Sequence, residues 1–528
     1  MTANMKLWLV AAGEVLLVIA FFFAVAGIAP PGINEAHYFA KSKNYWDPTW
    51  CNKDLFASSG NPHLLFHLTF GALTSWFSLE TTAWIGRFIG WTIIAIGLRS
   101  VTVAITDKPL AVLAVALIWI AGVDGCNLAG EWVIGGIEGK VPAYGFMLLA
   151  LRMMIVGKWR WVWPWLGVAS AFHVLVGGWS VVAAMLVYAC DERTDSGTGA
   201  KRLRSQWIPL FIGGLIAALG VYPAIALTQG VASETVTEAA RIYSYERLTH
   251  HLLPSALNRE WYLRHGVLVL LTGFACWMLR RDQRFVAIRT FTIGAVVIAT
   301  LGLAIGLLPR YEPDLAAKLL RYYWFRMTDA VVPLALALAW VRLPIYVSGS
   351  HLLNVGRAVV AIVAFWIVGS QAVETTRMTV VTDSGRVVSA VGMNTRIDNR
   401  QRVVSDWIAV CEWVDRTLPK DEVLLTPRNQ HTFKWYANRA EVVNWKDVPQ
   451  DAESLVEWSH RFYDVFPLRL GTVRVTVRYP DLIRFRKQYG ARFMIVDRRF
   501  SGQSLPLVQV YPLSPYESNA TYGVYRLP

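Results

Sequence analysis

The sequence predicts an α-helical polytopic membrane protein with a small C-terminal α/β domain, and three observations lead to this fold class. The chain of 528 residues is 55% hydrophobic and only 17% charged, whereas soluble domains carry about 25% charged residues. Apolar segments long enough to cross a bilayer, about 17–25 residues each, recur through the first two thirds of the chain. After Val373, short apolar runs alternate with amphipathic helical patterns. We therefore expect a transmembrane domain over residues 1–373 and an α/β domain over residues 374–528.

The transmembrane domain is expected to contain about 11–12 spans. Nine apolar segments are each predicted to cross once: 7–29, 82–104, 108–123, 141–157, 206–228, 265–281, 286–308, 328–346 and 351–373. Residues 162–189 are expected to form two further short helices with a turn at Gly177-Gly178, because basic loops flank this stretch on both sides. The first segment is long for a signal peptide, although AVAG at 24–27 resembles a cleavage site, so an uncleaved first span is favoured.

Basic residues in short loops predict the orientation of these spans. They gather in GKWRW (157–161), AKRLRSQW (200–207) and LRRDQR (279–284), which we therefore expect on the cytoplasmic side. The loops on the outer face are then 30–62, 124–140, 229–264 and 309–327, together with the C-terminal domain. Residues 63–78 are a short apolar stretch that we expect to dip into the membrane without crossing, and the parity of crossings in this region stays open.

The C-terminal domain combines strand patterns with helical patterns. DEVLLTP (421–427), AEVVNW (440–445), ARFMIVD (491–497) and GVYRLP (523–528) are short apolar runs bounded by Pro, Asp or Gly. Helical spacing of apolar residues occurs between them, which predicts an α/β domain with a largely parallel sheet. The loop TPRNQHTFKWYANRAEVVNWKDVPQD (426–451) follows the first of these strands. It is expected either to present ligand contacts or to dock the domain onto the membrane part.

Several function classes are disfavoured by charge, cysteines and motifs. The formal net charge of +14 lies largely in short loops, and no basic recognition helix is visible, so nucleic acid is not an expected partner. The five cysteines are scattered, with neither a disulfide framework nor metal spacing. One pairing, Cys51 with Cys126, would join two outer loops. The chain has no Walker A loop, no G-x-S-x-G elbow and no H-E-x-x-H motif.

The first outer loop carries ionisable residues directly after an apolar span. PPGINEAHYFAKSKNYWDP (30–48) contains Glu35, His37 and Asp47 among several aromatics. Burial penalises a charged carboxylate, and a carboxylate held here suits the role of proton acceptor for a hydroxyl that becomes a nucleophile. The alternative is an ordinary solvated loop with Tyr and Trp at the membrane interface.

A second outer loop places charges next to glycines. DGCNLAGEWVIGGIEGKVPAYGF (124–146) contains Glu131, Glu138 and Lys140 between two apolar segments. Ionisable residues at membrane depth are costly and usually face a cavity or a partner. Glycines around Glu138 permit a sharp turn or a close approach of the backbone. The alternative is a plain Gly-rich turn with an internal Glu138–Lys140 pair.

Basic residues at other outer segments complete the candidate site. His173 in FHVLVGGW lies at the outer end of the proposed hairpin, and His250 lies in the long outer loop. Arg321 and Arg326 open a span from the outside, where positive charge is unusual. Guanidinium groups there suit a lipid-linked phosphate. The alternatives are a packing histidine and snorkelling arginines. No set of metal ligands is predicted.

This layout resembles the GT-C class of membrane glycosyltransferases. Glu35 in NEAHYF (34–39) stands where that class keeps an acidic residue of its long first outer loop, and Glu138 in IGGIEGKVPAYGF (134–146) stands where many members keep a second. FHVLVGGW and TFKWYANRAEVVNWKDVPQD also look similar to an uncharacterised bacterial membrane-protein family of this shape. The first loop departs from the class because Asn34-Glu35 replaces a pair of acids, which leaves metal dependence open.

The resemblance implies transfer of a sugar, with inversion, from a polyprenyl-phosphate-type lipid donor to an acceptor hydroxyl on the outer face. It implies Glu35 as general base, with Asp47 as the fallback. Glu138 would orient donor or acceptor, and the phosphate would be held by Lys140, Arg321 and Arg326. Further substrate contacts are expected from His37, His173 and His250.

The expected partners are a polyprenyl-phosphate-linked sugar donor, a glycan, lipid or protein acceptor, and membrane lipids. No cofactor is firmly expected, and a divalent metal is left open. The expected location is a bacterial inner membrane. A transporter or lipid-handling protein, with a path at mid-bilayer, and a non-catalytic assembly protein, without a cavity, are the alternatives. A transferase predicts a cavity at the outer interface that Glu35 and Glu138 both line, with Arg321 or Arg326 nearby.

Overall fold

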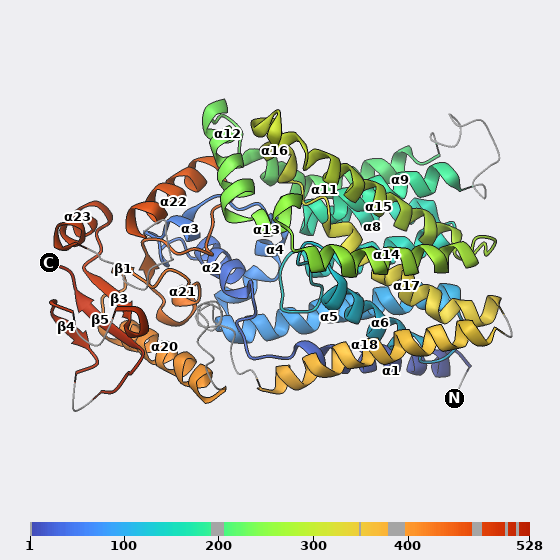
Figure 1. Ribbon diagram of the computed structural model, residues 1–528, viewed down its shortest axis with the longest axis horizontal. Coiled ribbons are helices and arrows are strands. Elements are labelled where there is room, and N and C mark those ends of the chain that lie inside the picture. The colour runs from blue at the N-terminus through green and yellow to red at the C-terminus, as the bar shows by residue number, and fades with distance from the viewer. Residues whose placement is uncertain are drawn as a thin grey trace.

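Long helices lie side by side, and a small sheet lies at one end of them (Figure 1). The computed structural model describes residues 3–191, 205–347, 350–377, 397–466, 478–501, 505–513 and 517–528. The N-terminus lies at the end of the helices that is remote from the sheet and the C-terminus (Figure 1). The predicted fold class is confirmed in these residues: a mostly helical chain with candidate membrane spans and a small C-terminal sheet.

The long helices correspond to the predicted spans. They are α1 (Ala3–Ala26), α5 (Leu79–Ile105), α6 (Ala111–Cys126), α7 (Lys140–Ile155), α8 (Trp159–Phe172), α9 (Val174–Cys190), α11 (Trp207–Ala226), α14 (Arg259–Met278), α15 (Val286–Ile305), α17 (Arg326–Tyr346) and α18 (His351–Arg377). Six of them, α1, α5, α11, α15, α17 and α18, are long and apolar enough by themselves to cross a membrane. A Cβ on Gly167 of α8 would lie 2.4 Å from the carbonyl oxygen of Gly213 in α11. Any side chain larger than that of glycine at position 167 would therefore prevent α8 and α11 from packing this closely.

The chain runs along the helical bundle once in each long helix, so its connections alternate between the two ends (Figure 1). Residues 63–78 contain only α4 (Leu64–Leu68) and the 3-10 helix η1 (Gly71–Ser75), which are too short to cross a bilayer. Two long helices, α5 and α6, therefore separate residues 30–62 from residues 124–140. This even number returns the chain to the same end of the helical bundle.

The hairpin over residues 162–189 turns at a different residue from the one expected. The break between α8 and α9 is His173, whose backbone is extended with φ −152° and ψ 103°. Gly177 and Gly178 lie within α9. A Cβ on Gly177 would lie 2.2 Å from the backbone nitrogen of Ser170 in α8. Gly177 is therefore required for the close packing of α8 against α9. The prediction of a turn at Gly177-Gly178 was wrong.

Short helices fill the segments at the sheet end of the bundle. Before α5 these are α2 (Glu35–Trp46), α3 (Leu55–Ser58), α4 and η1, and between α11 and α14 they are α12 (Ser233–Arg241), η3 (Ile242–Arg247), α13 (Thr249–Leu252) and η4 (Pro254–Ala256). Between α15 and α17 they are η5 (Leu308–Arg310) and α16 (Pro313–Leu320). All five cysteines are free thiols, so Cys51 and Cys126 are not joined.

The C-terminal sheet is mixed rather than largely parallel. Its strands are β1 (Val423–Leu425), β2 (Ala440–Glu441), β3 (Phe493–Asp497), β4 (Gln509–Tyr511) and β5 (Tyr522–Arg526), in the order β2-β1-β3-β5-β4. β1 is parallel to β2 and β3, and β5 is antiparallel to β3 and β4. The helices of this region are α20 (Ile397–Thr417), α21 (Phe433–Ala437), α22 (Ala452–Val465), α23 (Tyr479–Tyr489) and α24 (Arg498–Ser501).

One face of α20 packs into the core of this region. Trp407, Val410, Cys411 and Val414 recur at the spacing of a helical stripe, and all four are buried in one cluster with Leu424 of β1. The indole nitrogen of Trp407 donates to Thr432 Oγ1 over 2.9 Å. This packing fixes the segment after β1, which carries several residues of the site described next.

Candidate functional site

A cavity of about 1470 Å³ lies where the long helices meet the C-terminal region. Its lining comes from the ends of long helices, including Lys140 at the start of α7, His173 between α8 and α9, and Arg326 at the start of α17. Other walls come from α2, α4, α11 and α16, from the segments before α7 and between α11 and α14, and from the loops after β1 and β2. The cavity therefore lies at one end of the helical bundle and not at its middle.

The lining carries far more positive than negative charge. Its lysines and arginines are Lys41, Lys140, Arg247, Lys318, Arg321, Arg326, Arg428 and Lys446, eight in all, against two carboxylates, Glu131 and Glu138. Six histidines also line it: His37, His63, His67, His173, His250 and His251. A concave surface with walls of low dielectric and one sign of charge focuses the field on a ligand of the opposite sign. The cavity is therefore suited to an anion.

The two cavity carboxylates are both held by cations. Lys140 Nζ lies 3.0 Å from Glu138 Oε1 and 2.7 Å from Glu131 Oε1. Arg326 Nε lies 2.8 Å from Glu131 Oε2. The Nη1 of Arg326 also faces His173 Nε2 at 2.8 Å, and because an arginine can only donate, this nitrogen of His173 is the acceptor. These contacts neutralise Lys140 and Arg326 but leave the other cations without a counter-charge from the two carboxylates.

Arg428 is the clearest cation without a counter-ion in the described part of the chain. Its guanidinium lies over the rings of Phe462 and Trp445, at 4.9 Å and 5.4 Å from their centroids. Its Nη1 is buried and has no hydrogen-bond partner there. Lys318 and Arg321 likewise form no ion pair with a carboxylate among the described residues. Buried donors are almost always paired in folded proteins, so Arg428 Nη1 has donor capacity available to a ligand or water.

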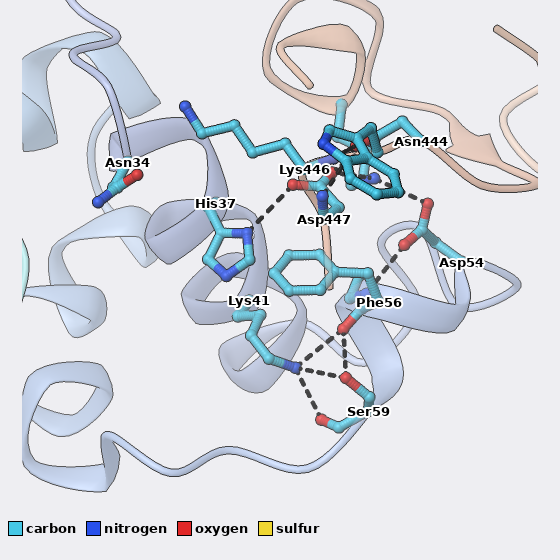
Figure 2. A network of polar contacts seen from close by, with 12 residues as sticks. Asn34, His37, Lys41, Asp54, Phe56, Ser59, Asn444, Lys446 and Asp447 are labelled. Atoms are coloured by element: carbon cyan, nitrogen blue, oxygen red, sulfur yellow. Dashed lines mark hydrogen bonds and ion pairs between the residues drawn. The ribbon is translucent and has the colours of Figure 1, made fainter. Parts of the chain in front are cut away.

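Lys41 is a further cavity cation that sequence reasoning missed. Its Nζ donates to the backbone carbonyls of Phe56 and Ser59, over 2.8 and 2.9 Å, and to Ser59 Oγ over 2.9 Å (Figure 2). Burial lowers the pKa of Lys41 to about 7, although nearby carboxylates oppose this shift. An anion in the cavity would favour the charged form of this side chain.

Glu35 does not line the cavity, contrary to the sequence prediction. Its carboxylate accepts hydrogen bonds from Arg87 Nε over 2.6 Å and Arg87 Nη2 over 2.5 Å. It also accepts from the backbone nitrogens of Gly32, over 2.6 Å, and Ile137, over 2.9 Å. Glu35 is 1% exposed and Arg87 is 0% exposed. Because a general base must reach the proton it removes, this position is structural. The neighbouring Asn34 reaches the cavity instead and donates to Glu138 Oε2 over 2.7 Å.

Asp47, the fallback base, also lies outside the cavity. It is exposed at the C-terminal end of α2 and accepts from Thr49 Oγ1 over 2.6 Å and from Thr49 N over 3.1 Å. These hydrogen bonds, more than its slight burial, hold the pKa of Asp47 below its ordinary value. Its position in a local turn leaves it no part in the cavity.

The structure does bring together every side chain that the sequence suggested for substrate binding. His37, Glu138, Lys140, His173, His250, Arg321 and Arg326 all line the cavity. Their binding of a substrate stays a prediction. Sequence reasoning missed Arg247 and Lys446 as cavity residues. A basic residue in a predicted outer loop, where positive charge is unusual, was the available signal for Arg247.

A buried ionic cluster joins the C-terminal region to the first outer loop. Lys434 Nζ lies 2.8 Å from Asp447 Oδ2, 2.7 Å from Glu441 Oε1 and 3.1 Å from Asp54 Oδ2. Asn444 donates to Glu441 and to Asp447, over 2.8 and 2.9 Å. The segment 426–451 docks the C-terminal region through this cluster and also lines the cavity through Arg428 and its neighbours. Its contact with a ligand stays a prediction.

Burial and charge shift the pKa values in this cluster in opposite directions. Burial raises the pKa of Glu441 to about 7 although Lys434 opposes it. Burial would also raise the pKa of Asp447, but Lys434 and His37 outweigh it and hold that pKa well below its ordinary value. Among the described residues no group of three or more His, Cys, Asp or Glu side chains has an arrangement that could hold a metal ion.

His37 connects the cluster to the cavity. Its Nδ1 lies 3.2 Å from Asp447 Oδ1, and its ring packs against Phe56 with 4.1 Å between centroids (Figure 2). Lys446 extends past it and donates to the backbone carbonyl of Ile33 over 2.5 Å. His37 thus has one ring nitrogen on a carboxylate of the C-terminal region while its side chain lines the cavity.

One wall of the cavity is apolar and belongs to α11, a helix long and apolar enough to cross a membrane. Val221, Ala224 and Ile225 of α11 line it. Ile225 is also 59% exposed, and the same helix exposes other large apolar residues such as Tyr222 and Leu215. In a membrane-spanning helix such a surface faces lipid tails. The cavity is thus cationic at the helix ends and apolar along α11, whose exposed surface is also apolar.

Residues 405–465 match the model of a domain of unknown function, DUF6798, and this match includes Arg428 and Asp447. No curated protein matches the chain. Among solved structures, the chain is similar to ArnT from Cupriavidus metallidurans in the apo state, with 12% identity, a TM-score of 0.41 and coverage of 100% of this chain and 99% of that chain.

A second similar structure is the archaeal oligosaccharyltransferase AglB from Archaeoglobus fulgidus, in complex with an inhibitory peptide and a dolichol-phosphate. Its identity is 11%, its TM-score is 0.43, and the match covers 94% of this chain and 70% of that chain. Both TM-scores lie below 0.5, so neither similarity assigns an activity to this chain. The functional conclusion depends on the geometry of the cavity.

Proposed function

We propose that the chain is a membrane transferase that takes a sugar from a polyprenyl-phosphate-type lipid donor and passes it to an acceptor hydroxyl. The observation that supports this proposal is the composition of the cavity. It has an excess of cations at the helix ends and an apolar wall beside the lipid-facing surface of α11. A lipid phosphate has the matching form, with an anionic head group and an apolar chain.

The cavity cations suit both binding and departure of a phosphate. A hydrogen bond to a charged group contributes about 1.5–3 kcal/mol, and guanidinium groups bind phosphate oxygens in pairs. Lys318, Arg321 and Arg428 have no described carboxylate within ion-pair distance and are best placed for this role. When a sugar leaves a phosphate carrier, negative charge grows on that phosphate, and fixed cations in a water-poor site stabilise such charge.

The placement of the cavity disfavours the alternative classes. A transporter needs a path at mid-bilayer, whereas the polar lining here belongs to helix ends and to the segments that join them. An assembly protein needs no cavity of about 1470 Å³. A lipid-handling protein without chemistry would share the cationic cavity and its apolar wall, and the experiment below separates it from a transferase.

The proposed orientation places the C-terminal region outside the cell. Helices α9 and α14 end away from the sheet (Figure 1), and so does α7, because successive long helices alternate in direction. Each is followed in the sequence by a basic stretch: GKWRW, AKRLRSQW and LRRDQR. Short basic loops stay cytoplasmic, so the cavity and the C-terminal region face the outer side, in a bacterial inner membrane. The acceptor is then a glycan, lipid or protein hydroxyl on that side.

The test uses the full chain in lipid nanodiscs with radiolabelled polyprenyl-phosphate sugars and membrane extract as the source of acceptor. The parent is expected to transfer label, and Arg428→Ala is expected to lower transfer about tenfold or more, because a charged hydrogen bond is lost. Arg484→Ala, which removes an exposed arginine of α23, is the matched control and should equal the parent. Binding of donor lipid without transfer of any tested sugar would instead identify a lipid-handling protein.

A further inference from the structure

We infer that His37 is the proton acceptor of the proposed transfer and that Asp447, from the C-terminal region, positions its ring. This inference rests on the proposed function, and it replaces Glu35 and Asp47, which the structure places outside the cavity. Its basis is one pair of side chains that the fold brings together from residues 410 positions apart.

The hydrogen bonds of His37 leave one ring nitrogen available. Asp447 Oδ1 lies 3.2 Å from Nδ1, and a carboxylate that is ionised only accepts hydrogen bonds, so Nδ1 carries the proton. The Nε2 then holds the free lone pair, and it has no hydrogen-bond partner among the described residues. The side chain of His37 is 18% exposed and lines the cavity. This nitrogen is therefore free to accept a proton from a ligand.

Asp447 is itself held firmly. Its side chain is 2% exposed, it pairs with Lys434 at 2.8 Å, and its second oxygen accepts from Asn444 Nδ2 over 2.9 Å. The backbone nitrogen of Asp447 donates to Asn444 Oδ1 over 2.8 Å. A ring held by such a carboxylate keeps one tautomer and one orientation, which is the function of a positioning residue.

The other bases in the cavity are less suited to this role. Glu131 and Glu138 are paired with Lys140 or Arg326, so their oxygens are already engaged by cations. The Nε2 of His173 faces the guanidinium of Arg326. Of the six cavity histidines, only His37 lies within ion-pair distance of a carboxylate in the part of the chain that the structure describes.

The surroundings of His37 favour a neutral ring. Burial lowers the pKa of His37 from its ordinary value of 6.5, Asp447 raises it, and Lys41 on α2 and Lys446 in the loop after β2 lower it. The third packed element, α3, contributes the uncharged ring of Phe56. The net shift is downward, so at neutral pH the ring is mostly unprotonated and able to accept a proton.

The oxygen of the acceptor hydroxyl attacks the anomeric carbon of the sugar and forms a new C–O bond, while Nε2 of His37 takes the hydroxyl proton. The bond from the anomeric carbon to the carrier phosphate breaks, and its electron pair stays on the phosphate oxygen. Attack from the side opposite the phosphate inverts the anomeric configuration. The imidazolium then releases its proton to water, and the ring returns to its neutral form.

The test compares His37→Gln with the parent in nanodiscs. A general base contributes about 10²–10⁴-fold, so transfer should fall by that factor while binding of undecaprenyl phosphate stays unchanged. His460→Gln removes an exposed histidine of α22 that does not line the cavity, and it should transfer at the parental rate. Asp447→Asn should keep donor binding but move the acidic limb of the pH–rate profile.

A second measurement does not depend on turnover. Diethyl pyrocarbonate acylates neutral imidazole, so peptide-resolved mass spectrometry should find His37 modified at neutral pH and protected by undecaprenyl phosphate. An unreactive His37, or a His37→Gln variant that transfers at the parental rate, would overturn the base assignment alone. A parent that binds the lipid and protects His37 but transfers no sugar would overturn the proposed function and the base role with it.

Discussion

Replacing Glu35 by Gln is expected to destabilise the protein by about 3–5 kcal/mol, which is the cost of removing one partner from a buried ion pair. The carboxylate accepts four hydrogen bonds, two from Arg87 and one each from Gly32 and Ile137. The amide of Gln keeps one acceptor oxygen and turns an NH₂ group toward a donor. It also leaves the guanidinium of Arg87, which is fully buried, without a counter-charge.

The assay is a double-mutant cycle on the detergent-solubilised protein, read from denaturant unfolding. Arg87→Met should cost a similar amount, because it strands the buried carboxylate. The variant with both substitutions should lose clearly less than the sum of the two, since removing both charges together is often near neutral. Glu80→Gln, at an exposed position at the start of the same helix α5, serves as the control and should unfold like the parent.

Two results would refute this reasoning. If the double variant were destabilised by the full sum, Glu35 and Arg87 would not act as a pair. If Glu35→Gln unfolded at the parental midpoint and yet lost transfer, Glu35 would take part in the chemistry, and its carboxylate would not have the structural role that its four hydrogen bonds indicate.

Three further predictions concern the cavity, the ionic cluster and the helix packing. Arg428→Ala should weaken binding of undecaprenyl phosphate about 10- to 100-fold, as expected for loss of a charged hydrogen bond, and a fluorescence titration with unchanged affinity would contradict this. Burial raises the pKa of Glu441 from 4.5 to about 7, so the folded protein binds this proton more tightly than the unfolded chain does. The stability that this proton contributes is therefore complete below pH 4.5 and is lost as the pH rises through 7. Glu441→Gln should flatten that decline in thermal unfolding, and an unchanged slope would exclude Glu441 as its source. Gly139→Ala would place a methyl group 2.6 Å from the carbonyl oxygen of Phe172 and should cost about 1–3 kcal/mol, whereas Gly178→Ala, with nothing within 4 Å, should be neutral in the same unfolding experiment.

The helical part of the fold could be predicted from sequence because its signal is local. A stretch such as 82–104 must form a helix in lipid to satisfy its backbone, and the observed helix α5 extends it by only a few residues at the first end. The turn within 162–189 was harder to place, since both a turn and close packing favour glycine. Only the position of Ser170 in the neighbouring helix shows that Gly177 serves packing.

The membership of the site could be predicted better than the roles within it. Charged residues at the ends of apolar segments are costly unless they face a cavity or a partner. This rule selected residues such as Glu138 and Arg326, which line the cavity. Glu35 satisfies the same rule through its partner, and that partner, Arg87, lies 52 positions away inside an apolar span. The pairing of His37 with Asp447 depends on how the C-terminal region docks, and no local pattern in the sequence contains that information.

For the proposed lipid donor, the apolar wall that α11 gives the cavity is the expected route of entry. A molecule that enters between the cationic head-group site and the exposed flank at Ile225 travels within one leaflet and never dissolves in water. Its supply is then set by its mole fraction among the surrounding lipids and by two-dimensional diffusion, so detergent added to a reaction would dilute the substrate even when the bulk concentration is constant.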